Sequence, residues 1–303
     1  MLRSFFLLLS RNRSLRRYFE TSRSAASLTK RFVAGNTLAE GMQVNGQLAE
    51  RGIFVALDHL GENVSSESEA ALAAQEIVAA LDRIGTAGTN TTVAIKLTQF
   101  GLDLGDEVCR RHLRPVFTLA AAIGTRVEID MESTVYTERT LGIVKEMHAE
   151  FGCVRAVLQA YLFRTEQDVT ELNQLGVPIR LCKGAYQETS DVAYPSKADV
   201  DANFVKLMET LLREGAYPAI ASHDERILTH ALAYSKELKL APDRYEFQML
   251  YGIRRQWQQR LVDQGQRLRL YVPYGEAWYP YFMRRLAERP ANVIFLATNM
   301  LES

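Results

Sequence analysis

The sequence lacks a surplus of charge of either sign and has little cysteine. Its 303 residues carry 36 basic and 36 acidic side chains, and this balance gives no support for binding of nucleic acid by the whole protein. The three cysteines, Cys109, Cys153 and Cys182, are scattered along the chain and follow no zinc-ligand spacing. A scattered, odd-numbered set also argues against a disulfide framework, so we expect three buried thiols in a reducing compartment.

The amino-terminal segment lacks a hydrophobic run long enough to cross a membrane. The apolar run at 5–9 is too short, and most of the nearby positive charge follows it, which is the wrong order for a secretory signal. Residues 1–31 are strongly basic, with eight Arg and Lys residues against the single acid Glu20. Three interpretations stay open: a basic helix that covers one end of the fold, an amphipathic segment attracted to anionic lipid, and an organelle transit peptide.

From Arg51 onward, short apolar or β-branched runs alternate with longer helical segments. The expected strands lie at 53–57, 92–95, 126–129, 155–158, 178–182, 218–221, 245–250 and 268–272, and the last is expected to stop at Pro273 and Gly275. The expected helices lie at about 65–84, 105–123, 135–151, 167–175, 199–215, 225–238 and 276–292, and one more helix follows the seventh strand and ends at about 263.

Strands that alternate with helices pair in parallel through right-handed crossovers. Eight such units at this length predict an α/β fold, a closed (β/α)8 TIM barrel over residues 51–303, behind a helical N-terminal extension over residues 1–50. An open doubly wound sheet is the alternative, but no Gly-x-Gly-x-x-Gly motif follows the first strand.

Polar side chains stand at the ends of almost all the expected strands. In a barrel these ends converge on one mouth, where active sites lie. The residues are Asp58, Lys96, Asp130, Gln159, Arg180 with Lys183, His223 and Tyr271. The last helix adds Tyr281, Arg284 and Arg285 at helical spacing, so that one aromatic ring and two guanidinium groups share a face that can grip a small carboxylate.

Several chemistries fit such a mouth. Asp130 and Glu132 can bind a hard cation, but no second histidine lies near and the cationic groups repel a metal. Lys96 or Lys183 can serve a Schiff-base aldolase, but arginines crowd the same mouth. An anionic, aromatic cofactor beside a small anionic substrate accounts for two sets of cations, and Gly184 and Ala185 offer small residues where backbone amides can approach a pyrophosphate. A binding module without catalysis is a further alternative.

Seven ordered segments resemble those of the FAD-dependent proline dehydrogenase family, and the resemblance runs from Arg51 to the C-terminus. The chain is similar in size to the single-domain bacterial enzyme of this family. The segments are Val93-Ala94-Ile95-Lys96-Leu97, Ile129-Asp130-Met131-Glu132, Leu158-Gln159-Ala160-Tyr161-Leu162, Ile179-Arg180-Leu181-Cys182-Lys183-Gly184-Ala185-Tyr186, Ala221-Ser222-His223-Asp224, Phe247-Gln248-Met249-Leu250-Tyr251-Gly252 and Tyr281-Phe282-Met283-Arg284-Arg285-Leu286-Ala287-Glu288.

The resemblance implies a role for each matching residue. The implied catalytic residues are Asp130 and Arg180, the latter near flavin N5. The implied residues around L-proline are Lys96, Arg284 and Arg285 on its carboxylate, with Tyr281, Tyr271 and Leu250 around its ring. The implied FAD contacts are Met131, Gln159, Lys183, Gly184, Ala185, Ser222 (where threonine is usual), His223 and Glu288. Glu62 is the implied gate, through a pair with Arg284, and no metal is implied.

The resemblance also implies partners. The reaction is oxidation of L-proline to Δ1-pyrroline-5-carboxylate by hydride transfer to FAD, the first step of proline degradation to glutamate. A membrane quinone takes the electrons, and pyrroline-5-carboxylate dehydrogenase is a further partner. We therefore expect a cytoplasmic protein attached peripherally to the anionic surface of the inner membrane, with no nucleic-acid partner and with the transit-peptide interpretation still open.

Overall fold

The computed structural model of the chain describes residues 31–279 and residue 281. Eight parallel strands close into a barrel in sequence order, with β8 paired to β1. The strands are β1 (Phe54–His59), β2 (Thr91–Lys96), β3 (Val127–Asp130), β4 (Val154–Gln159), β5 (Ile179–Cys182), β6 (Ala219–Ala221), β7 (Glu246–Leu250) and β8 (Leu268–Tyr274). The predicted TIM barrel is confirmed.

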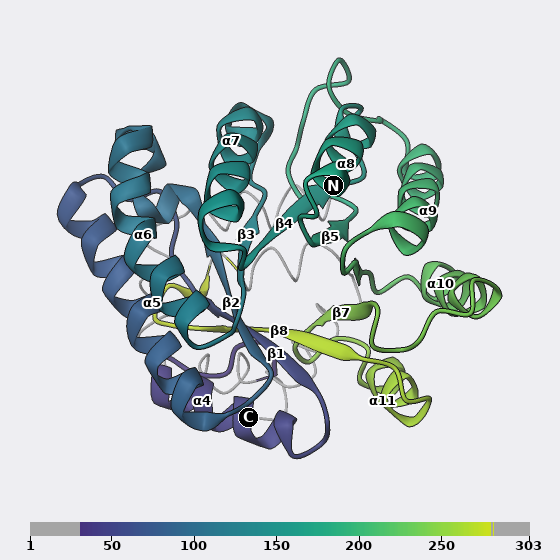
Figure 1. Ribbon diagram of the computed structural model, residues 1–303, viewed down its shortest axis with the longest axis horizontal. Helices are drawn as coiled ribbons and strands as arrows, with labels where there is room; N and C mark the ends of the chain where they lie inside the picture. Colours follow the sequence, from purple (N-terminus) through teal and green to yellow (C-terminus); the bar gives the residue numbers. More distant parts are fainter. Residues whose placement is uncertain (1–30, 280, 282–303) are drawn as a thin grey trace, which may run out of the picture.

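Helices surround the barrel in a single outer layer (Figure 1). They are α4 (Leu38–Ala49), α5 (Glu67–Ala87), α6 (Asp106–Ala122), α7 (Thr134–Phe151), α8 (Thr165–Gln174), α9 (Lys197–Glu214), α10 (Glu225–Glu237) and α11 (Arg255–Asp263). The seven expected helices between residues 65 and 263 agree with α5 to α11 to within a few residues. The expected helix at 276–292 lies largely outside the described residues. Two short 3₁₀ turns between β2 and α6, η1 (Leu97–Phe100) and η2 (Leu102–Leu104), were not expected from the sequence, because runs this short carry no helical periodicity.

The helix α4 belongs to the predicted N-terminal extension, yet it packs on β1 and β8 as part of the outer layer. The chain before it is tied to the carboxyl end of the barrel. The backbone N–H of Ala34 donates to the carbonyl of Pro273 at 2.8 Å, and that of Gly275 donates to Gly35 at 2.9 Å. The division of the chain at residue 50 remains a prediction, and α4 fills the position of an eighth outer helix beside β8.

The last strand is longer than the sequence predicts. Pro273 does not stop it, because β8 continues to Tyr274 and pairs with β1 from Arg269 to Tyr274. A proline near a strand end loses one amide donor but keeps its carbonyl, and here that carbonyl accepts the hydrogen bond from Ala34. Tyr271 therefore lies in the middle of the strand and not at its end.

The two cysteines in α6 and before β4 are buried, and Cys182 at the end of β5 is half-buried, so the expectation of three buried thiols holds for two. Burial raises the pKa of Cys109 to about 12 and that of Cys153 to about 11. These thiols are protonated at neutral pH and act as small apolar side chains of the core. No helix within residues 31–279 is long and apolar enough to span a membrane.

The inside of the barrel is charged, although TIM-barrel interiors are mostly filled by branched apolar side chains. Side chains of a strand alternate between its two faces, so residues two apart point the same way. This alternation carries Glu128 inward with Asp130, Gln248 with Leu250, and Arg269 with Tyr271. Glu128, Arg155 and Glu246 are completely buried.

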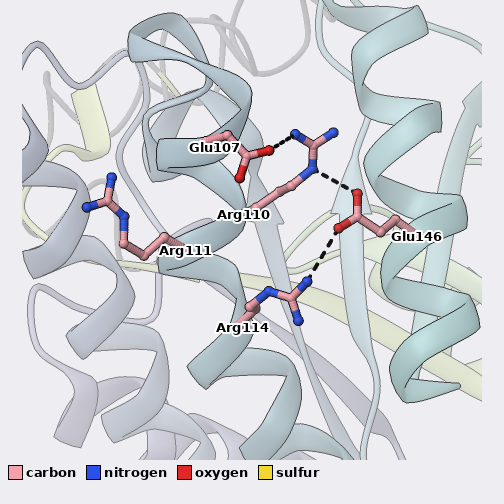
Figure 2. A pocket seen from close by; sticks show the side chains of 5 residues that line it. All are labelled: Glu107, Arg110, Arg111, Arg114 and Glu146. Carbon is pink, nitrogen blue, oxygen red and sulfur yellow. Dashed lines mark hydrogen bonds and ion pairs between the residues drawn. The ribbon is translucent and has the colours of Figure 1, made fainter.

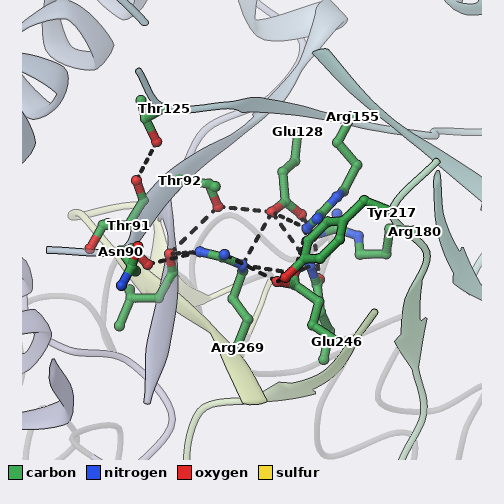
Figure 3. A network of polar contacts seen from close by, with 12 residues as sticks. Asn90, Thr91, Thr92, Thr125, Glu128, Arg155, Arg180, Tyr217, Glu246 and Arg269 are labelled. Carbon is green, nitrogen blue, oxygen red and sulfur yellow. Dashed lines mark hydrogen bonds and ion pairs between the residues drawn. The ribbon is translucent and has the colours of Figure 1, made fainter. Parts of the chain in front are cut away.

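Figure 3 shows how these charged side chains form ion pairs with one another. Arg155 Nη1 lies 3.0 Å from Glu128 Oε1 and 2.5 Å from Glu246 Oε1, so that it bridges two carboxylates. Arg269 donates twice to Glu246, through Nε at 2.8 Å and Nη2 at 3.1 Å. Tyr217 donates to the same carboxylate at 3.1 Å. We call Glu128, Arg155, Arg180, Glu246, Gln248 and Arg269 the interior cluster.

Burial by itself raises the pKa of Glu128 and of Glu246. The positive charges of the neighbouring arginines outweigh that effect, so both carboxyl groups have pKa values below their ordinary range. Both are therefore ionised at neutral pH. Removal of one partner from a buried ion pair typically costs about 3–5 kcal/mol, because it leaves the other charge without compensation. The interior cluster consequently depends on all of its members together.

Candidate active site

The interior cluster continues into the mouth of the barrel through Arg180. Arg180 Nη1 donates to Glu128 Oε2 at 2.7 Å, and its Nη2 donates to Asp130 Oδ1 in a close contact. Asp130 also accepts from the Tyr271 hydroxyl at 2.7 Å. The guanidinium of Arg180 lies over the ring of Tyr271, 5.3 Å from its centroid. The three residues come from β3, β5 and β8, and the closed barrel brings them together.

Lys96, at the end of β2, sits between two carboxylates. Its Nζ lies 3.5 Å from Asp58 Oδ1 and 3.8 Å from Asp130 Oδ2. Register explains the second contact, because Lys96 pairs directly with Asp130 across β2 and β3. The structure thus brings together Asp58, Lys96, Asp130, Arg180 and Tyr271, all of which the sequence analysis placed at the mouth.

The Tyr271 phenol is held in its neutral form. Burial raises its pKa well above the ordinary value, and the nearby negative charge of Asp58 adds to the shift. Tyr281 also raises it, while Arg180 acts in the opposite direction. Tyr281 is buried, with 6% of its surface exposed. Tyr281 therefore lies close enough to Tyr271 to affect it, and its predicted role at the mouth stays a prediction.

The residues after β3 and β4 are linked beside the mouth. Gln159 Nε2 donates to the carbonyl of Glu132 at 2.9 Å. The Glu132 carboxylate accepts from the hydroxyl of Thr98 at 2.7 Å and from its backbone N–H at 3.2 Å. Burial raises the pKa of Glu132, against these two hydrogen bonds. Met131, between Asp130 and Glu132, is buried as well.

Lys183 lies just beyond β5 in a small ionic group at the rim. It donates to Asp224 at 2.9 Å and makes a close contact with Asp201 near the start of α9. Lys197 pairs with both carboxylates. Asp224 is also the N-cap of α10, where it accepts from the N–H of Arg226 at 3.1 Å. Two helix starts therefore fix the position of the lysine that the family resemblance implies as an FAD contact.

Gly184 follows Lys183 with a φ of +114°. A Cβ atom added there would lie 2.2 Å from a ring carbon of Tyr161. Two constraints therefore require glycine at this position, the left-handed backbone and the close aromatic ring, while the predicted approach of its amide to a pyrophosphate stays a prediction.

The residues after β6 are positioned by hydrogen bonds to backbone groups. The Ser222 hydroxyl accepts from the N–H of Asp224 at 3.1 Å. His223 Nε2 accepts from the N–H of Leu250, at the end of β7, at 2.9 Å. Since an accepting nitrogen carries no proton, the neutral imidazole of His223 has its proton on Nδ1. The His223 ring is thereby oriented by the neighbouring strand.

Some predicted site residues are not placed at the mouth by the described part of the chain. Arg284, Arg285 and Glu288 are outside the described residues. Glu62 is exposed in the segment between β1 and α5, and its predicted partner Arg284 is among those outside. The interior residues Glu128 and Gln248 contact Arg180 directly, and the sequence analysis did not single them out. Their position two residues before Asp130 and Leu250 was the signal that could have identified them.

The geometry bears on two of the alternative chemistries. Asp130 is already engaged by Arg180 and Tyr271, whereas Glu132 is engaged by Thr98, so these carboxylates do not converge as a pair of ligands. Among residues 31–279 and 281, no three His, Cys, Asp or Glu side chains are grouped so as to hold a metal ion. Lys96 is ion-paired, which disfavours the neutral amine that a Schiff base requires.

A separate groove lies in the outer layer between α6 and α7 (Figure 2), lined by Glu107, Arg110, Arg111, Arg114 and Glu146. Its arginines are paired with carboxylates of the groove and of the neighbouring helix α5. Arg110 Nε lies 2.8 Å from Glu146, and Arg111 pairs with Glu67 at 2.9 Å. We interpret it as a network of surface ion pairs between the helices.

Comparison with known proteins identifies similar chains. A family model described as proline dehydrogenase matches residues 42–298. Proline dehydrogenase 1 of Bacillus subtilis (strain 168) is 39% identical over 302 residues, which is 100% of both chains. Proline dehydrogenase of Deinococcus radiodurans is 38% identical over 281 residues, 91% of each chain.

A solved structure is similar as well. It is proline utilization A (PutA) from Bdellovibrio bacteriovorus inactivated by N-propargylglycine, with a TM-score of 0.82 and 28% sequence identity. The match covers 94% of this chain and 36% of that longer one. The similarity therefore concerns one part of a larger protein.

Gly184→Ala tests the close contact with Tyr161. Gly176→Ala is the matched control, because Gly176 has a φ of +70° with open space around the added Cβ. We expect the control to lose about 1 kcal/mol of the free energy of unfolding, from backbone strain alone. Gly184→Ala should lose about 1–3 kcal/mol more, from overpacking against the ring. Urea denaturation measures both, and equal losses would show that Tyr161 moves aside without cost.

Proposed function

The chain belongs to the proline dehydrogenase family, and on this premise we propose that it oxidises L-proline to Δ1-pyrroline-5-carboxylate with FAD as the hydride acceptor. The observation that carries the proposal is the contact of Arg180 with Asp130 and Tyr271 at the mouth, beside Lys96. This arrangement brings the buried guanidinium of Arg180, the half-buried ammonium of Lys96 and a neutral phenol together at the mouth. The electrons would pass to a membrane quinone, and pyrroline-5-carboxylate dehydrogenase would consume the product.

The described residues fit a flavin dinucleotide. Lys183 offers an ammonium at the rim near the N-termini of α9 and α10, where helix dipoles favour phosphate. The hydroxyl of Ser222, the oriented imidazole of His223 and the amide of Gln159 supply hydrogen-bonding groups at the ends of β4 and β6. These residues, with Met131, Gly184 and Ala185, would hold the cofactor, and Glu288 would add a contact from beyond the described residues. When bound, FAD supplies the two-electron acceptor that the reaction needs.

The cations of the mouth suit proline in two ways. Lys96, Arg284 and Arg285 would bind its carboxylate and so fix the position of the ring, with Tyr281 and Leu250 packed on it. Nearby positive charge also favours the neutral amine, which is the form that can release a hydride from the adjacent carbon. Arg180 would stabilise the negative charge that appears on the reduced cofactor. Asp130 and Tyr271 would keep Arg180 in place, and Glu62 would cover the site by pairing with Arg284.

A flavin-free barrel lyase or aldolase is the competing function, and an anaerobic titration separates the two. We expect the purified protein to be yellow, and its flavin absorbance to bleach when L-proline is added without oxygen. D-lactate, which also carries a small carboxylate but no ring amine, is the control and should leave the spectrum unchanged. A colourless protein that cannot be reconstituted with FAD would favour the lyase, and a yellow protein that proline does not bleach would refute proline oxidation.

Arg285→Met tests the carboxylate assignment. The loss of a charged hydrogen bond in the transition state should cost about 3 kcal/mol, which lowers kcat/KM for proline by about a hundredfold. Arg111→Met is the matched control, because Arg111 lies on the outer face of α6 with 60% of its side chain exposed. Steady-state kinetics with both variants decide the point. A kcat/KM within about threefold of wild type would mean that Arg285 does not bind the carboxylate.

We propose further that the protein works in the cytoplasm, attached peripherally to the inner membrane. Residues 1–31 carry eight basic side chains, and Arg31 adjoins the carboxyl end of the barrel, where its Nε lies 3.4 Å from the carbonyl of Gly252. The basic segment thus joins the fold at the end that holds the candidate active site. Attraction of this segment to anionic lipid would bring the mouth toward a quinone dissolved in the bilayer.

Deletion of residues 1–20 tests this attachment. Each Lys or Arg near an anionic surface contributes about 1 kcal/mol, and salt screens that attraction. We expect the full chain to sediment with phosphatidylglycerol vesicles at low salt, and to do so less at high salt or after the deletion. Neutral phosphatidylcholine vesicles are the control. Equal sedimentation of the full and shortened chains would rule out this segment as the anchor.

A further inference from the structure

Arg180 is clamped along one edge by two carboxylates. Glu128 Oε2 accepts from Nη1 at 2.7 Å, and Asp130 Oδ1 accepts from Nη2. Gln248 Oε1 is a second acceptor for Nη1 at 3.2 Å. The guanidinium also lies over Tyr271, so both its edge and its face are constrained. An arginine with a long side chain is thereby held in one orientation.

Glu128 is itself rigidly placed. It is fully buried, and its other oxygen accepts from Arg155 at 3.0 Å and from Thr92 at 2.8 Å. Glu128 and Asp130 lie on the same strand, two residues apart, so their carboxylates face the barrel interior one above the other. A single strand therefore sets both ends of the clamp on Arg180.

We propose that Glu128 is a positioning residue for the oxidation, acting through Arg180. This inference rests on the proposed function. Glu128 holds the guanidinium at the depth where its charge faces the cofactor, and its own negative charge offsets part of that positive charge. The arginine pairs that hold the pKa of Glu128 below its ordinary range keep it ionised throughout the working pH. Glu128 sits beneath Arg180, on the inner side of the mouth, and touches no reacting atom.

Two substitutions separate position from charge. Glu128→Asp keeps the charge but withdraws the carboxylate from Arg180, whereas Glu128→Gln keeps the length but removes the charge. Tyr217→Phe is the matched control, because Tyr217 donates to Glu246 in the same buried network and has no contact with Glu128 or Arg180 among the described residues. A loss of network stability alone would affect all three variants.

We expect kcat per bound flavin to fall at least about tenfold in both Glu128 variants, because misplacement of Arg180 by a fraction of an ångström weakens transition-state stabilisation. KM for proline should stay within about threefold of wild type, since the carboxylate is bound by other residues. The flavin midpoint potential should become more positive in Glu128→Gln, where an anion near the reduced flavin is gone, and change little in Glu128→Asp. Tyr217→Phe should lower the melting temperature without changing kcat or the potential.

The outcomes are distinguishable. If wild type bleaches with proline while both Glu128 variants keep wild-type kcat and potential, the positioning role is refuted and the proposed function stands. If Tyr217→Phe lowers kcat as much as they do, the effect is structural and the inference is also refuted. If Glu128→Gln does not fold, the kcat of Glu128→Asp decides whether Glu128 has the positioning role. This variant preserves every charge of the interior cluster. A wild type that proline does not bleach refutes the proposed function and, with it, the inference.

Discussion

The charged interior of this barrel depends on one constraint: each buried carboxylate is shared among several hydrogen-bond donors. Glu128 accepts from Arg155 through one oxygen and from Arg180 through the other, and Glu246 accepts from Arg155 and Arg269. A buried charge without a partner costs several kcal/mol (roughly 3–5), so the closed barrel must bring these side chains together from five different strands. The same closure that buries them also supplies their partners.

This interior is continuous with the site at the mouth. Arg180 belongs to both, because one nitrogen of its guanidinium contacts Glu128 and the other contacts Asp130. Asp130 in turn meets Tyr271 and Lys96. A reaction that moves negative charge onto a cofactor needs cations that do not reorient during the step. The interior cluster provides that rigidity from below, while the loops above the strands remain available for binding.

The fold could be predicted from the sequence because alternating apolar runs and amphipathic segments are local signals, and the residues at the strand ends were named for the same reason. The partners of Arg180 were missed for a physical reason. Glu128 and Gln248 lie inside short strands, where a polar side chain at an alternate position looks the same whether it faces solvent or the barrel interior. Only the closure of the barrel, which brings inward-facing side chains of the non-adjacent strands β3, β5 and β7 together, tells the two apart. The end of β8 was also misplaced, since Pro273 loses its amide donor without leaving the sheet.

The position of α4 has a consequence for how the chain folds. The start of the helix is stabilised locally, because Thr37 and Glu40 form a reciprocal capping box there. One of the strands that it packs on, β8, is synthesised much later. The contact between Arg31 and Gly252 spans 221 residues of sequence. Contacts this distant make folding slow, and they leave apolar helix faces uncovered until β8 has been synthesised. Closure of the ring therefore waits for β8, and before that point the unfinished barrel is most exposed to aggregation.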